Sequence, residues 1–121
     1  MLKRCNKCGA LVKVLKDCNC DNCKIKCCDK PLEQITPNSV DASFEKHIPE
    51  YQINGENIEV RVNHVMDEDH YIEWISCTYD NKEQVVYFEP GNEPKATFKY
   101  VPGAKIYSYC NNHSLWLNEV K

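Results

Sequence analysis

Cysteine is distributed unevenly along this chain of 121 residues, and this uneven distribution limits how the N-terminal part of the chain can fold. Seven of the nine cysteines lie within residues 5–28. The same segment contains few large apolar side chains, so it cannot bury enough surface to fold by itself. We therefore expect a bound metal to supply the folding free energy of this region.

The cysteine count favours thiols and metal ligands over a disulfide framework. Nine is an odd number, which complete pairing within one chain cannot accommodate. The N-terminal sequence M-L-K-R-C-N-K lacks the apolar core of a secretory signal, and no apolar run reaches the length of about 18 residues that a membrane span requires. These features predict a cytoplasmic protein with no membrane segment, in a reducing compartment. The net charge of −3, without a basic stripe, argues against nucleic acid as a partner.

From about residue 44 onward the pattern of apolar residues predicts β-strands. Apolar and polar residues alternate in 58–64 and in 70–77. Further strands are expected at 84–88, 95–100 and 105–110, separated by turn sequences such as E-P-G-N-E-P. Alternation at this spacing predicts an antiparallel β-sandwich, and no amphipathic helix is expected.

The chain contains only four histidines, and they form a pattern with one cysteine. These residues are His47, His64, His70 and His113, with Cys110 three positions before the last. Imidazole and thiolate suit iron, copper, zinc and nickel. Five such ligands exceed the four of a structural zinc site and leave one octahedral position for a small substrate. His64 at the end of one strand and His70 at the start of the next would share a rim of the sheet, which the Cys110–His113 turn would complete. The set predicts a metalloenzyme.

Several separated motifs resemble those of the superoxide reductase family. They are E-K-H-I-P at 45–49, H-Y-I-E-W-I at 70–75, E-P-G-N-E-P at 89–94 and Y-C-N-N-H-S-L-W at 109–116. The stretch V-D-A-S-F-E-K-H at 40–47 and the cysteine-rich front resemble the two-centre form, desulfoferrodoxin. The resemblance covers nearly the whole chain, with the motifs in the family's order. It implies an all-β protein, with a small desulforedoxin-like metal-binding domain at 1–36 and an immunoglobulin-like antiparallel β-sandwich at 37–121.

The resemblance also implies the catalytic centre. It implies a square-pyramidal, mononuclear non-haem iron with four equatorial imidazoles, those of His47, His64, His70 and His113, and the axial thiolate of Cys110. His113 would bind through Nδ1 and the other histidines through Nε2. The implied activity is one-electron reduction of superoxide to hydrogen peroxide. Lys46 would attract superoxide and order a proton-donating water, and Glu45 would occupy the sixth position of the oxidised iron and help product leave.

The N-terminal cysteines resemble a desulforedoxin-type site. Cys5 and Cys8 form C-x-x-C, while Cys27 and Cys28 are adjacent, and these four are the favoured ligands of a second iron. Zinc also suits a tetrathiolate. The segment between the pairs departs from the family pattern, because it carries Cys18, Cys20 and Cys23. These three residues leave open alternative ligation, a second metal site or oxidation. Electron relay, structural support and dimer support are all compatible with the four-cysteine site.

The resemblance implies superoxide as substrate, rubredoxin or a similar small protein as electron donor, a homodimer, and the cytoplasm of an anaerobe or microaerophile. Three rivals remain: dismutation of superoxide, a rubredoxin-like electron carrier or thiol redox sensor, and a zinc-bound binding module. We expect Trp74 and Trp116 to serve packing, and Cys77 to be a small buried apolar residue on a strand.

Overall fold

The structure is a computed structural model, and it describes residues 1–121 except for the side chain of Phe44. The chain divides into two compact units, Met1–Thr36 (unit 1) and Pro37–Lys121 (unit 2). Among the described residues the single helical element is a short 3-10 helix, η1, at Phe44–Lys46. The predicted all-β class is therefore confirmed. No helix in the described part of the chain is long and apolar enough to cross a membrane.

Unit 1 is built from very short strands. β1 (Leu2–Arg4) lies between β2 (Leu11–Lys13) and β5 (Glu33–Gln34), and both pairings are antiparallel. β3 (Lys26–Cys27) and β4 (Lys30–Pro31) form a separate hairpin. Its described buried hydrophobic residues are Cys5 and Leu32. This is too little apolar surface to stabilise an independent domain, as the sequence predicts.

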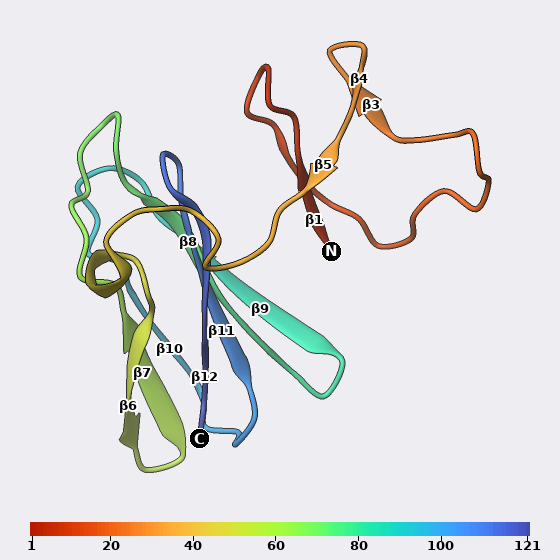
Figure 1. The fold of residues 1–121 in the computed structure, drawn as a ribbon. Coiled ribbons are helices and arrows are strands. Elements are labelled where there is room, and N and C mark those ends of the chain that lie inside the picture. The colour runs from red at the N-terminus through yellow and green to blue at the C-terminus, as the bar shows by residue number, and fades with distance from the viewer. The chain divides into compact units, whose positions relative to one another are not determined.

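Unit 2 consists of two antiparallel sheets, which Figure 1 shows as separate layers. The three-stranded sheet has the order β10-β7-β6, and the four-stranded sheet has the order β12-β11-β8-β9. The strands are β6 (Glu50–Asn54), β7 (Asn57–Arg61), β8 (Ile72–Tyr79), β9 (Lys82–Tyr87), β10 (Lys95–Lys99), β11 (Lys105–Cys110) and β12 (Ser114–Glu119). β6 and β12 have no counterpart among the predicted strands.

The core of unit 2 explains why alternation identified most of its strands. Ile58 and Val60 on β7 are 0% and 1% exposed, while their neighbours on the strand are exposed. Ile75 and Cys77 on β8 are both 0% exposed, which confirms the expectation for Cys77. Burying each large aliphatic side chain stabilises the fold by about 1.5–3 kcal/mol. This core fixes the strand ends on which the candidate site depends.

Candidate metal centres

Five predicted ligands of unit 2 lie together at one end of the sandwich. One ligand atom from each of them lies within 4.8 Å of all the others, and the residues are His47, His64, His70, Cys110 and His113. His47 directly follows η1, Cys110 ends β11, and His113 lies in the turn to β12. His64 and His70 both lie in the loop between β7 and β8. The expected strand-end positions are therefore wrong for both histidines, because β7 ends at Arg61 and β8 begins at Ile72.

The four imidazoles are arranged as the corners of a quadrilateral. Ring centroids are 4.8 Å apart for His47–His64, 4.6 Å for His64–His70, 5.1 Å for His70–His113 and 4.7 Å for His113–His47. His47 and His70 are 6.5 Å apart, which places them on a diagonal. The Cys110 Sγ lies 3.5 Å from His64 Nε2 and 3.9 Å from His113 Nδ1, two rings at the other corners. One thiol thus faces a near-square set of imidazoles.

Backbone carbonyls determine which ring nitrogen of His47 and His64 faces the cluster. His47 Nδ1 lies 2.6 Å from the carbonyl oxygen of Ser43, and His64 Nδ1 lies 2.5 Å from that of Val65. Since a carbonyl can only accept, each Nδ1 carries the proton and each Nε2 keeps a free lone pair. His47 Nε2 is 2.9 Å from His113 Nδ1, so His113 presents the opposite nitrogen to the cluster.

The donor set fits a transition-metal ion. His70 Nε2 is buried and has no hydrogen-bond partner among the described residues, which is costly unless a ligand satisfies it. Burial lowers the pKa of the His47 and His64 imidazoles, so both stay neutral and able to coordinate. Burial raises the pKa of the Cys110 thiol, so a bound cation is needed to stabilise its thiolate. Neutral nitrogens around one sulfur are ligands for iron, copper, zinc or nickel.

Two buried residues that the sequence analysis did not assign to the site support His47. The Trp116 ring stacks on the His47 ring at 4.9 Å, and its Nε1 donates a hydrogen bond to the carbonyl of His113 at 3.0 Å. The Ser108 hydroxyl donates to the carbonyl oxygen of His47 at 2.8 Å. Trp116 is 2% exposed, so its expected packing role is confirmed, with a candidate ligand as a packing partner.

Asn111 joins the two loops that carry the remaining ligands. Its Oδ1 accepts a hydrogen bond from the backbone N–H of Tyr71 at 2.9 Å, and its Nδ2 donates to the carbonyl of Asp69 at 3.0 Å. The chain therefore holds the segment around His70 directly against the Cys110–His113 turn. The register of β11 against β8 also shifts between Tyr109 and Cys110, a bulge of the kind that redirects side chains beside functional sites.

Glu45 and Lys46 lie in η1, immediately before His47, and both side chains are exposed. The positive charge of Lys46 adds a small contribution to the lowered pKa of His47, behind the larger effect of burial. Lys46 is therefore close enough to act electrostatically on the cluster.

Four cysteines of unit 1 form a second group of candidate ligands. Each has a sulfur within 4.8 Å of the others, and they are Cys5, Cys8, Cys27 and Cys28. The Cys8 and Cys27 sulfurs are 3.6 Å apart, and those of Cys27 and Cys28 are 3.9 Å apart. Thiolates tetrahedrally bound at about 2.3 Å would have edges of about 3.8 Å, so the group fits a tetrathiolate metal site.

Tight turns position both cysteine pairs. In the first turn, the Gly9 N–H donates to the carbonyl of Cys5 at 2.9 Å, and Gly9 has a φ of 80° that favours glycine. In the second, Cys28 and Asp29 have φ values of 52° and 63°. Two successive positive values are typical of the two-residue turn in a β-hairpin, here between β3 and β4.

The electrostatics of this second group call for a cation. The backbone N–H of Cys8 lowers the pKa of the Cys5 thiol to about 6. The neighbouring sulfur of Cys8 raises the pKa of Cys27 to about 12, and that of Cys28 is raised as well. The metal-free group thus retains protons, and a metal would allow all four sulfurs to be thiolates.

The three remaining cysteines of unit 1 lie outside this group among the described residues. Cys18 is a free, exposed thiol, and Cys20 and Cys23 are joined by a disulfide. Of the fates left open by the sequence, the structure thus shows oxidation for two of these residues. The C-x-x-C spacing in a turn brings the Cys20 and Cys23 sulfurs within bonding reach.

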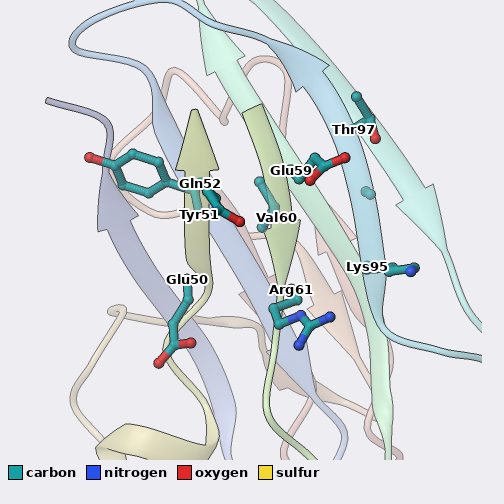
Figure 2. Close-up of a pocket in the computed structure, with 9 residues that line it drawn as sticks. Glu50, Tyr51, Gln52, Glu59, Val60, Arg61, Lys95 and Thr97 are labelled. Carbon is teal, nitrogen blue, oxygen red and sulfur yellow. The ribbon is translucent and has the colours of Figure 1, made fainter. Parts of the chain in front are cut away.

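A concavity of about 540 Å³ lies on the outer face of the three-stranded sheet (Figure 2). Strand register places Glu50, Arg61 and Lys95 in one row across the sheet. This row holds one carboxylate and two cationic groups, and exposed charged side chains of this kind are typical of a solvated sheet face. None of the described residues lining it belongs to either candidate metal centre.

Comparison with known proteins identifies relatives along nearly the whole chain. The desulfoferrodoxin family model matches residues 39–119. The desulfoferrodoxin of Syntrophotalea carbinolica is 36% identical over 96% of this chain and 93% of that protein. The superoxide reductase of Pyrococcus horikoshii is 33% identical over 71% of this chain and 95% of that protein.

Solved structures show a similar fold. The superoxide reductase of Treponema pallidum has a TM-score of 0.71 at 24% identity and covers 98% of this chain and 99% of its own. The superoxide reductase of Giardia intestinalis has a TM-score of 0.55 at 29% identity and covers 64% of this chain and 98% of its own. The extent of the sequence match, over units 1 and 2 together, shows that the chain belongs to the desulfoferrodoxin family.

Proposed function

We propose that this protein is a superoxide reductase, an oxidoreductase that converts superoxide to hydrogen peroxide. The observation that carries the proposal is the convergence of four inward-facing imidazoles on Cys110, in a family that includes proteins named superoxide reductase. Each turnover consumes one superoxide, one electron and two protons. The η1 turn that leads into His47 is exposed at Glu45 and Lys46.

Iron is the metal we propose for the unit 2 site, where it would supply one electron to superoxide. His47, His64, His70 and His113 would hold it through neutral nitrogens, and Cys110 through its thiolate. A single anionic ligand among five leaves positive charge at the site, which favours an anionic substrate.

Glu45 and Lys46 are the two residues we propose to act on substrate and product. The Lys46 ammonium would raise the local concentration of superoxide even though the whole chain carries a charge of −3. It would also order a water that donates a proton. The Glu45 carboxylate would take the place of departing peroxide. The exposed position of both residues in the turn that leads into His47 supports these roles.

For unit 1 we propose a desulforedoxin-like domain that holds a second iron, or zinc, through Cys5, Cys8, Cys27 and Cys28. Unit 2 would then be the catalytic β-sandwich. The proposed electron donor is rubredoxin or a similar small reductant, and the proposed assembly is a homodimer. The cytoplasm is the proposed compartment, because the described cysteines outside the Cys20–Cys23 pair form no disulfide, which is typical of reducing surroundings.

Product analysis tests the activity. Iron-loaded protein should consume superoxide and form peroxide only while an external electron donor is supplied, and oxygen should not appear beyond the spontaneous background. Stoichiometric oxygen release without a donor would instead assign the protein to superoxide dismutation.

Deleting residues 1–36 tests the rival assignment as an electron carrier or thiol sensor. Unit 2 has its own core, so the truncated protein should fold and retain superoxide reduction. Loss of superoxide consumption from a folded, iron-loaded unit 2 would favour the rival. Zinc in both centres of protein matured with ample iron would favour the binding module.

A further inference from the structure

The Cys20–Cys23 disulfide is a redox feature that neither candidate metal centre uses. It lies in the exposed segment C-N-C-D-N-C at 18–23, and its Cα atoms are 5.7 Å apart. That separation is ordinary for a protein disulfide. We propose that Cys20 and Cys23 form a reversible dithiol–disulfide couple, oxidised by hydroperoxides and reduced by dithiols.

A purely structural role does not account for this disulfide. Its two cysteines are three positions apart in the sequence, and the stabilisation from closing a ring grows with the length of the ring. The enclosed residues form a turn and contribute no strand. The loop between Cys8 and Cys27 is already closed at its two ends by the four-cysteine group, in which the sulfurs of these two residues lie close together. A staple at Cys20–Cys23 would therefore add little to the fold.

The surroundings of the pair favour exchange with solutes. Exposed disulfides are more easily reduced than buried ones, and both cysteines are exposed. Together with Cys5, Cys18 and Lys24, they line an open concavity of about 830 Å³ within unit 1. The described cysteines outside the pair form no disulfide, so the Cys20–Cys23 bond is not part of a set of structural disulfides. An isolated disulfide in an otherwise thiol-bearing chain is typical of redox sites.

The start of the loop is anchored, which holds the pair at the concavity. Lys3 on β1 forms an ion pair with Asp17 at 2.8 Å. Asp17 Oδ1 in turn accepts a hydrogen bond from the backbone N–H of Cys18 at 2.8 Å. This connection fixes where the loop leaves the small sheet, and it does not require the disulfide itself. Opening the S–S bond would therefore leave both thiols near each other.

The chemistry balances with two electrons. One thiolate attacks a peroxide oxygen, so the O–O bond breaks, an S–O bond forms, and the released hydroxide or alkoxide is protonated to water or an alcohol. The second thiol then attacks the sulfenic sulfur, so the S–S bond forms and the S–O bond breaks with loss of water. Thiol–disulfide exchange with an external dithiol restores both thiols and yields the oxidised dithiol. Any hydroperoxide suffices, so the couple does not depend on the proposed superoxide chemistry.

Thiol mapping on the full-length, metal-loaded protein tests the couple. The protein is reduced with dithiothreitol, freed of reductant, exposed to hydrogen peroxide, alkylated and mapped by mass spectrometry. Both alkylatable thiols at positions 20 and 23 should be lost with metal content unchanged, and dithiothreitol without denaturant should restore them. Cys18→Ser is the matched control and should behave as wild type. In Cys20→Ser and Cys23→Ser, the remaining thiol should instead be trapped by dimedone as a sulfenic acid.

Four results would overturn the proposal. Cys20 and Cys23 could both remain alkylatable after peroxide treatment, or Cys18 could replace one of them in the disulfide. The disulfide could also resist dithiothreitol in the native protein, which would make it a fixed staple. Finally, a third metal per chain that protects Cys18, Cys20 and Cys23 from alkylation would make the loop a metal site. Superoxide consumption, measured separately, reports on the proposed function and not on this couple.

Discussion

The two candidate metal centres differ in what holds their ligands in place. In unit 2, His47 and Cys110 are 3% and 0% exposed, and their positions are set by strand ends and buried hydrogen bonds. In unit 1, Cys8 and Cys28 are exposed, and the strands around them are two or three residues long. The first centre is therefore preorganised by a hydrophobic core. The second depends on its metal to order the chain.

The ligand charges of the two centres also differ. One thiolate among four neutral imidazoles leaves a divalent ion with excess positive charge, which attracts an anion to an open position. Four thiolates outweigh a divalent ion and fill a tetrahedron, so they leave no place for a substrate. Under the proposed function, this contrast places substrate chemistry in unit 2 and electron transfer or structural support in unit 1.

The largest expected effect is a difference in how the two units respond to removal of their metals. Chelation under reducing conditions should unfold unit 1, since structural tetrathiolate sites contribute about 10–16 kcal/mol to folding. The core strands of unit 2 should keep their structure. Amide hydrogen exchange of metal-free and metal-loaded protein measures this, with β1 and β8 as reporters. Retained protection in β1, or loss of protection in β8 together with β1, would contradict the contrast between the centres.

The next largest effect is expected from the axial sulfur of unit 2. Cys110→Ser should abolish the sulfur-to-iron charge-transfer absorption and lower superoxide turnover by about 100-fold or more, because it replaces a thiolate ligand. Cys77→Ser is the matched control: it also alters a fully buried cysteine, but one outside the cluster. It should leave the absorption band intact and cost about 1–3 kcal/mol of stability by burying a hydroxyl. An unchanged band in Cys110→Ser would remove this sulfur from the ligand set.

A smaller effect is expected from the link between the two ligand loops. Asn111→Ala removes two side-chain hydrogen bonds and should lower the free energy of unfolding of unit 2 by about 1–3 kcal/mol. Metal retention during dialysis against a chelator should fall as well. Asn112→Ala, at the exposed neighbouring position, should change stability by no more than about 0.5 kcal/mol. Equal effects of the two substitutions would show that Asn111 does not position the His70 loop.

The strands that the sequence predicts correctly are those with one buried face. β7 and β10 alternate because one face of each lines the core, whereas β6 is an edge strand in which only Tyr51 is partly buried. β12 reads S-L-W-L-N-E, and its adjacent Leu115 and Trp116 are both buried, so alternation is lost. The strands of unit 1 are too short to show any period.

The site residues that the sequence predicts are likewise those with a local signal, whereas residues that act through long-range contacts were missed. Ligand candidates were recognisable because the chain has only four histidines and because these and the ligand cysteines occur in family motifs. Asn111 was missed because its partner Tyr71 lies 40 positions earlier, and nothing local marks an asparagine in a turn as a link. The packing of Trp116 was predictable, but its stacking on His47 depends on a pairing across the whole fold.

The smallest expected effect concerns Lys46, on the exposed side of the unit 2 centre, where the core contributes least to holding side chains in position. Lys46→Ala should slow the second-order reaction with superoxide by about threefold to tenfold and flatten its dependence on ionic strength, because one positive charge beside the cluster is lost. Lys99→Ala is the matched control, since Lys99 is exposed and pairs with Asn57, at the opposite end of β7 from the His64 loop. Stopped-flow measurement at several salt concentrations should show the effect in Lys46→Ala alone. An unchanged rate and salt slope would mean that the positive charge of the metal and its ligands attracts the anion without help from Lys46. The core, which positions those ligands, would then also control substrate capture.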